Sequence, residues 1–184
     1  MIRAVVALVG SAGFLVYVFV VRTDRSRWVR FASRADAASG ALLALGVLCA
    51  LGTPALMLIG RLDPATTSAT VGFAGALVLA TGIAIAVVAQ RQLGAAWRPG
   101  IDPDDRVALV TSGLYHRSRN PFYLGWIVAN IGAALLVPTV AEVVAFALLI
   151  AALEVVVRFV EEPALRASHG AAFTAYTAKT RRFI

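Results

Sequence analysis

The sequence is poor in charged residues and nearly free of cysteine. Only 15% of its 184 residues are charged, whereas 60% are hydrophobic. Soluble domains usually carry about a quarter of charged residues and about half of apolar ones. The shortage of charge therefore argues against a soluble fold and makes the bilayer the expected solvent. The lone cysteine, Cys49, lies in an apolar run and excludes an intramolecular disulfide.

Residue patterns that build metal, phosphate or nucleic-acid sites are also missing. His116 and His169 lack cysteine or carboxylate partners at metal-ligand spacing, so no metal site is predicted. Asp102, Asp104 and Asp105 are typical of a solvated turn. There is no glycine-rich phosphate loop and no GxSxG elbow. The net charge of +7 is dispersed between apolar blocks, which does not favour nucleic acid as a partner.

Long apolar runs dominate the chain instead. Crossing about 30 Å of hydrocarbon takes roughly 20 apolar residues in a helix. Five segments qualify or come close: 4–21, 37–60, 69–89, 122–137 and 143–157. The last two are short, and Tyr123 and Trp126 at the interface, or a tilt, would complete them. The sequence predicts an all-α, polytopic transmembrane bundle of about five spans, as one integral membrane domain over residues 1–184.

The distribution of basic residues predicts the orientation of this bundle. Arg3 and Arg61 are the only basic residues on one side of the predicted spans, and all the others fall on the opposite side. Those others lie between spans one and two, between spans three and four, and in the tail. Because basic loops stay in the cytoplasm, we expect the N-terminus outside and the C-terminus inside. The polar loop 90–120 and the tail 158–184 would then meet at the cytoplasmic face.

The loop ends in a polar run, 112–123, that carries a candidate anion site. Gly113 permits a turn, and Pro121 suits the first position of a helix with Asn120 as its N-cap. One interpretation is a helix cap with interfacial aromatic residues. The other is that Arg119, Asn120 and the positive end of the fourth span hold a carboxylate.

The fifth span continues beyond its apolar part with a series of charges. Glu154, Arg158 and Glu162 are spaced by four residues and can form a ladder on one helical face. Glu154 lies about one turn inside the predicted span, where a carboxylate is costly and usually functional, although an ion pair with Arg158 that only braces the helix is the alternative. Pro163 is expected to break or kink the helix near residues 160–162.

Taken together, four motifs in order resemble the isoprenylcysteine carboxyl methyltransferase family and its prokaryotic relatives, which include phospholipid methyltransferase-like proteins. The resemblance covers residues 90–184, whereas residues 1–89 form the N-terminal spans. The motifs are LGAAW at 93–97, GLY at 113–115 with RNPFY at 119–123, RFVEEPAL at 158–165, and the segment 170–176.

The resemblance implies an integral membrane enzyme that transfers the methyl group of S-adenosylmethionine. Its cofactor pocket would lie between the cytoplasmic loop and the C-terminal helix, and a lipophilic small molecule would enter from the bilayer. Arg158 and Glu162 would lie at the reacting centre. The cofactor-binding residues would be Gly113, Tyr115, Arg119, Asn120, Pro121, Tyr123 and Glu161. The alanine-rich composition suggests a bacterial protein, located in the cytoplasmic membrane.

The acceptor and two competing functions stay open at this level. A carboxylate acceptor needs no base, whereas an amine needs Glu161 or Glu162 to take a proton. A membrane NADPH-dependent enzyme resembling sterol reductases is one alternative function. A non-catalytic membrane subunit or lipid-binding protein is the other. The sequence gives no oligomeric state.

Overall fold

The computed structural model describes residues 1–18, 34–63, 68–97 and 108–183. Secondary structure in these ranges is helical, apart from one isolated bridge between Ser118 and Arg181. The predicted turn at Asp102, Asp104 and Asp105 lies outside the described residues. The long helices are α1 (Ile2–Val16), α2 (Arg34–Leu58), α3 (Ala69–Leu93), α4 (Pro121–Leu136), α5 (Val140–Val156) and α6 (Glu162–Lys179). Three short turns join them: η3 (Gly94–Ala96), η4 (Gly113–His116) and the π turn η5 (Val157–Glu161).

Each of the five predicted apolar segments forms a helix within the described residues, so the all-α fold is confirmed there. Within the described ranges, three helical stretches are long and apolar enough to cross a membrane, namely Gly40–Leu58, Ala69–Leu93 and Val140–Lys179. The apolar helices α1 and α4 have 15 and 16 residues. At 1.5 Å per residue they are roughly 23 Å long, which is short of the bilayer core. The predicted orientation of the termini stays a prediction.

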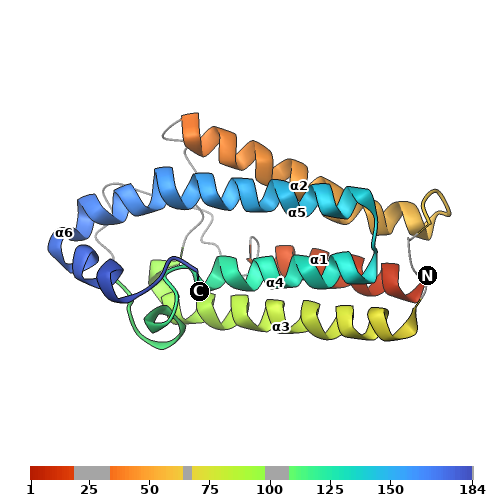
Figure 1. The fold of residues 1–184 in the computed structure, drawn as a ribbon, viewed down its shortest axis with the longest axis horizontal. Coiled ribbons are helices and arrows are strands. Elements are labelled where there is room, and N and C mark those ends of the chain that lie inside the picture. Colours follow the sequence, from red (N-terminus) through yellow and green to blue (C-terminus); the bar gives the residue numbers. More distant parts are fainter. Residues whose placement is uncertain (19–33, 64–67, 98–107, 184) are drawn as a thin grey trace.

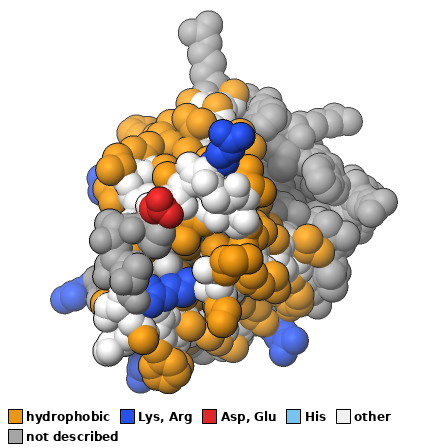
Figure 2. Space-filling view, turned by 90° about the vertical axis from the view of Figure 1, so that its right-hand side faces the viewer, with side chains coloured by type: hydrophobic (Ala, Val, Ile, Leu, Met, Phe, Trp, Pro, Cys, Tyr) orange, Lys and Arg blue, Asp and Glu red, His pale blue; other side chains and the backbone are white. Residues whose placement is uncertain are grey.

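The helices form two layers, which Figure 1 shows from the side. Helices α2 and α5 lie together in one layer, and α1, α3 and α4 form the other. Helix α6 lies at one end of the bundle, and the C-terminus returns from it toward the start of α4. The bundle end farthest from α6 presents mainly hydrophobic side chains with scattered charges (Figure 2).

Helices α3 and α4 approach closely because glycines line their contact. A Cβ atom at Gly82 would lie 2.2 Å from the Ala129 nitrogen, and one at Gly132 would lie 2.2 Å from the Leu79 nitrogen. Only glycine permits such backbone contact, which is a common way for membrane helices to associate. The antiparallel contact fixes the start of α4 beside the end of α3.

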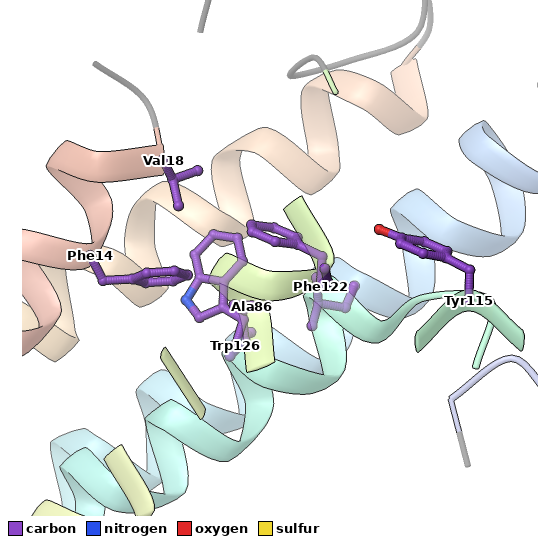
Figure 3. Packing of buried hydrophobic residues seen from close by; sticks show 9 residues of the cluster. Phe14, Val18, Ala86, Tyr115, Phe122 and Trp126 are labelled. Atoms are coloured by element: carbon purple, nitrogen blue, oxygen red, sulfur yellow. The ribbon is translucent and has the colours of Figure 1, made fainter. Parts of the chain in front are cut away.

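An aromatic cluster fills the bundle next to this seam. Phe14 of α1 packs edge-on against Trp126 of α4, with ring centroids 6.3 Å apart, and Phe122 lies beside both (Figure 3). Trp126 is 8% exposed. Trp126 therefore packs inside the bundle, and its predicted position at the membrane interface stays a prediction. Its ring faces α1, where it fills space between helices that glycine brings close on their other side.

The helix that begins with α5 extends well past its apolar part. Up to the kink at Gly170, residues 140–169 measure about 45 Å, half as long again as the hydrocarbon thickness. We therefore take residues 140–157 as the span and place η5 and α6 beyond it. The π turn at η5 comes just before Pro163, where the sequence predicts a break or kink. A second kink, at Gly170 with φ of 50°, turns α6 back toward the loop.

Candidate functional site

A carboxylate held by two arginines forms the centre of the site. Glu162, the first residue of α6, accepts two parallel hydrogen bonds from Arg182, from Nε at 2.7 Å and from Nη2 at 2.8 Å. Arg119 Nη1 lies 3.1 Å from the same carboxylate, and both of these side chains are 14% exposed. We call Arg119, Glu162 and Arg182 the Arg–Glu–Arg cluster. It joins the loop, α6 and the residues after α6, 180–183, which we call the C-terminal tail.

Backbone contacts fix the tail against the loop. Arg119 donates its backbone N–H to the carbonyl of Arg181 at 2.9 Å, and Asn120 Nδ2 donates to the carbonyl of Arg182 at 2.9 Å. The hydroxyl of Tyr176 donates to the carbonyl of Tyr115 at 2.5 Å. The tail therefore forms one wall of the site, because its carbonyls are bound from both the loop and the start of α4.

Asn120 and Pro121 hold the predicted places at the start of α4, as N-cap and first-turn proline. The Asn120 side chain makes no capping hydrogen bond. It binds the tail instead. The interpretation of Asn120 as a simple side-chain cap is therefore wrong, since its amide group connects two parts of the candidate site.

Arg158 and Glu162, the two residues predicted at the reacting centre, have different partners. Arg158 pairs with Glu154 on the outside of the helix, where the arginine side chain is 51% exposed. Glu162 points to Arg119 and Arg182. The π turn between them inserts an extra residue and rotates the helix that follows. The Glu154–Arg158 pair of the predicted ladder is therefore present. Glu162 pairs with Arg119 and Arg182 instead of Arg158.

Glu161, the last residue of η5, lies beside Glu162 along the chain but has a different environment. The Tyr123 hydroxyl of α4 donates a hydrogen bond to its carboxylate. Tyr115 of η4 is buried nearby. Burial and the neighbouring Glu161 carboxylate raise the pKa of the Tyr115 phenol far above its usual value, so that this phenol stays protonated. The site thus holds two carboxylates with different partners.

The Arg–Glu–Arg cluster carries a net positive charge. The hydrogen bond from Arg182 and the charge of Arg119 hold the pKa of Glu162 below its usual value despite partial burial. Glu162 is therefore ionised at neutral pH, and two guanidinium groups share one carboxylate. Arg119 Nε is buried and finds no hydrogen-bond partner among the described residues. The cluster has the charge and a free donor to accept one more anionic group.

The loop reaches this place through a turn that requires glycine. Gly113 has φ of 63°, and a Cβ there would lie 2.6 Å from Gln92 Oε1. That same oxygen accepts the backbone N–H of Leu114 at 2.8 Å. The predicted turn at Gly113 is confirmed, and it holds η4 directly against the end of α3.

A cavity opens in the bundle below the site. Its volume is about 30 Å³, and its lining is mostly apolar, with residues from α1, α2, α3, α4 and α5. Phe14, Gly46 and Trp126 are among them, and Asn130 adds a polar group. Trp126 lies about one helical turn from Tyr123 on α4, so the cavity and the polar site follow the same side of this helix.

Arg182 is the site residue that the sequence analysis did not single out. It lies twenty positions after Glu162, and the kink at Gly170 brings them together. The sequence predicts that the tail meets the loop, but a basic tail has no preferred partner until its path is known. Of the loop candidates, Arg119 and Asn120 contact the tail and Tyr115 contacts Tyr176, whereas Tyr123 binds Glu161. Their role in cofactor binding stays a prediction.

Comparisons with known proteins address the family. The family model for phospholipid methyltransferase matches residues 70–172, which is more than half of the chain and covers α3, α4, α5 and the first part of α6. No curated protein and no solved structure matches the chain significantly. This family includes the integral membrane methyltransferases that the four motifs resemble. The chain belongs to the phospholipid methyltransferase family.

Proposed function

We propose that this protein transfers the methyl group of S-adenosylmethionine to a lipophilic acceptor at the membrane surface. The observation that carries the proposal is the Arg–Glu–Arg cluster, which has an excess of positive charge and an unpartnered Arg119 Nε. The family match supports a membrane methyltransferase. The cofactor and the acceptor are our inference.

The residues of the site fit the amino-acid end of the cofactor. Its carboxylate would take the free Nε of Arg119, because charge-assisted hydrogen bonds to guanidinium are the strong ones. Its ammonium group would face the carboxylates of Glu161 and Glu162. By the resemblance, the rest of the binding site would be supplied from the loop and the start of α4, by Gly113, Tyr115, Asn120, Pro121 and Tyr123.

S-adenosylmethionine supplies a methyl group on a positively charged sulfur, which leaves as a neutral thioether when the acceptor's lone pair forms the new bond to carbon. The protein contributes position and a dry environment. The Arg–Glu–Arg cluster orients the donor, while Tyr123 and Glu161 close the side toward the bundle.

An amine acceptor requires a group that takes its proton, and the two carboxylates differ in fitness for this. Glu162 is ionised and held by two arginines, so protonation would break strong contacts. Glu161 has a tyrosine hydroxyl as its partner. We therefore assign Glu161, rather than Glu162, as the proton acceptor for an amine substrate. A carboxylate acceptor would use neither.

The lipophilic character of the acceptor follows from the cavity. The cavity is small, about 30 Å³, but its mainly apolar lining suits hydrocarbon. Its lining includes Trp126, about one helical turn from Tyr123 on α4, and we infer that part of a hydrocarbon chain lies there while its head reaches the site. Arg158, on the outer surface beside Glu154, would steer an anionic headgroup as the molecule arrives from the cytoplasmic leaflet of a bacterial inner membrane.

A methyl-transfer assay tests this proposal. Purified protein in vesicles of bacterial lipid would be incubated with S-adenosylmethionine labelled on its methyl group, and label in the organic extract counted. Label released by mild alkali identifies a methyl ester, whereas alkali-stable label identifies an N-methyl product. Glu161→Gln should abolish N-methylation and spare ester formation. No label in any lipid fraction, with protein shown to be folded, would favour a non-catalytic membrane subunit.

A further inference from the structure

The cavity inside the bundle has a serine and an asparagine in a lining that is otherwise mainly apolar. They are Ser11 of α1 and Asn130 of α4. The Asn130 amide nitrogen donates to the carbonyl of Trp126 at 3.0 Å, one turn earlier in its own helix. The Asn130 side-chain oxygen and the Ser11 hydroxyl have no hydrogen-bond partner among the residues that the structure describes. The cavity therefore presents two groups that can still bind a polar ligand atom.

Ser11 and Asn130 lie at the same depth in the bundle. The contact of the Phe14 and Trp126 rings gives the reference level (Figure 3). Helix α1 runs toward the end of the bundle that holds the Arg–Glu–Arg cluster, and α4 runs away from it (Figure 1). Ser11 precedes Phe14 by about one helical turn, and Asn130 follows Trp126 by about one turn. Both side chains therefore lie one turn deeper than the two rings, where one small group in the cavity can reach both.

The size of the cavity suits one small oxygen-bearing group. A cavity needs about 10–15 Å³ to hold a water molecule, and this cavity has a volume of about 30 Å³. A buried polar group without a hydrogen bond costs stability. A plain hydrocarbon chain in this place would leave Ser11 and Asn130 without partners. The lining therefore favours a chain that carries an oxygen atom at this depth.

Asn130 lies almost two helical turns from the proposed methyl-transfer site. Tyr123, which binds Glu161 at that site, is on the same face of α4, and the rise between the two residues is about 10 Å. An extended chain covers roughly 1.2 Å per bond. An acceptor whose head lies beside Glu161 therefore places about its ninth chain atom beside Asn130.

We propose that Ser11 and Asn130 bind a hydroxyl group on the chain of the acceptor, about 10 Å from its methylated head. A hydroxyl both donates and accepts, so it can donate to the Asn130 oxygen while it accepts from the Ser11 hydroxyl. A carbonyl on the chain would only accept and would leave the Asn130 oxygen without a partner. The inference rests on the proposed function and narrows its acceptor to a hydroxylated lipid.

Matched chain probes test the assignment on the unmodified full chain in lipid nanodiscs. The probes are labelled dodecanoic acid and dodecylamine, each as the plain chain, with a hydroxyl on the ninth carbon, and with a keto group there. Binding is corrected for empty nanodiscs. With at least one of the two heads, the hydroxyl probe should bind about tenfold or more tightly than the plain and keto probes, because a site that pairs with a hydroxyl rejects chains without one.

Three results would overturn the hydroxyl site: equal binding of hydroxyl and plain probes with both heads, equal binding of hydroxyl and keto probes, or no binding of any probe. Calorimetry with S-adenosylhomocysteine on the same preparation reports on the proposed function separately. Saturable heat from that ligand without a hydroxyl preference would overturn the hydroxyl site alone. Absence of that heat would contradict the methyltransferase proposal as well.

Variants of the two cavity residues give an independent measure. In Ser11→Ala and in Asn130→Leu the preference for the hydroxyl probe should fall about tenfold, while the plain chain binds as well as before or better. Ser11→Thr keeps the hydroxyl group and should keep the preference. Thr81→Val, at an exposed position of α3, is the control and should bind as the wild type does. A merely structural role would change stability and leave the preference intact, which would contradict the assignment.

Discussion

Arg182 and Glu162, twenty positions apart in the chain, form a pair of parallel hydrogen bonds of 2.7 and 2.8 Å. The pair is mostly enclosed, with side-chain exposures of 27% and 14%. It connects the last residues of the tail to the first residue of α6. The site therefore depends on the return of the tail, and several predictions can be made from that dependence.

Neutralising Glu162 should destabilise the protein. In Glu162→Gln, two guanidinium groups lose their common carboxylate, and we expect the free energy of unfolding in detergent to fall by about 2–3 kcal/mol. Thermal or denaturant unfolding measures this. Glu154→Gln is the matched control, since the Glu154–Arg158 pair is half exposed and should contribute within about 0.5 kcal/mol. Equal losses in both variants would show that the enclosed cluster has no special importance.

Breaking the tail contact should expose the tail to protease. Lys179 is the only lysine of the chain, so a lysine-specific protease has a single site just before the tail. In Arg182→Leu we expect cleavage there to become roughly tenfold faster, because charge-assisted hydrogen bonds no longer oppose local opening. Arg181→Leu is the control, because Arg181 contacts the loop through its carbonyl. A similar rate in wild type and Arg182→Leu would mean that the tail is held by other contacts.

The Arg–Glu–Arg cluster should also have a defined dependence on pH. The arginines lower the pKa of Glu162 in the folded protein. Its stabilisation is therefore complete above the ordinary value of 4.5 and is lost as the pH falls through the lower folded value. The difference in melting temperature between wild type and Glu162→Gln should stay constant from pH 7 to about pH 5 and shrink below that. A difference that vanishes already at pH 6 would refute the lowered pKa.

The α3–α4 seam should not tolerate a single added methyl group. In Gly82→Ala the new Cβ would meet backbone atoms of Ala129 at 2.2 Å, and forced separation should cost about 1–3 kcal/mol in unfolding free energy. Gly52→Ala, in α2, has no heavy atom within 4 Å of the new Cβ. That variant should be as stable as the wild type or slightly more so, because alanine favours the helix. Tolerance of Gly82→Ala would argue against this close seam.

Filling the cavity should affect the acceptor and not the cofactor. Ala50 lines the cavity from α2, and in Ala50→Phe the ring would occupy space proposed for the hydrocarbon chain. We expect KM for the lipid acceptor to rise about tenfold, as for ligands that lose buried apolar contact, with unchanged affinity for S-adenosylhomocysteine. Leu48, on the same helix, is 69% exposed, and Leu48→Phe should leave KM unchanged. An unaltered KM in Ala50→Phe would remove the cavity from the proposal.

Local chemistry explains which features could be predicted from the sequence. The apolar helices follow from run length, and the start of α4 follows from the preferences of Asn120 and Pro121, which act within one turn. The turn at Gly113 similarly needs only a glycine. These features depend on neighbours in the chain, and the structure confirms them to within a few residues.

The features that could not be predicted depend on distant parts of the chain. Arg182 reaches Glu162 only after the helix turns at Gly170, and Asn120 finds the tail rather than its own helix. Trp126 is buried because α1 covers it. Spacing of four residues placed Arg158 and Glu162 on one face, but the π turn at Val157–Glu161 alters the register. Sequence patterns over a few neighbouring residues cannot predict such contacts.

Calorimetric titration with S-adenosylhomocysteine tests the central claim most directly. The wild-type protein, purified in detergent and shown to be folded, should give saturable heat with this ligand and none with NADPH. Arg119→Leu should lose most of the affinity, because the proposed carboxylate partner is gone. Absence of heat from S-adenosylhomocysteine, or heat from NADPH alone, would contradict the proposal that this site binds a methyl donor.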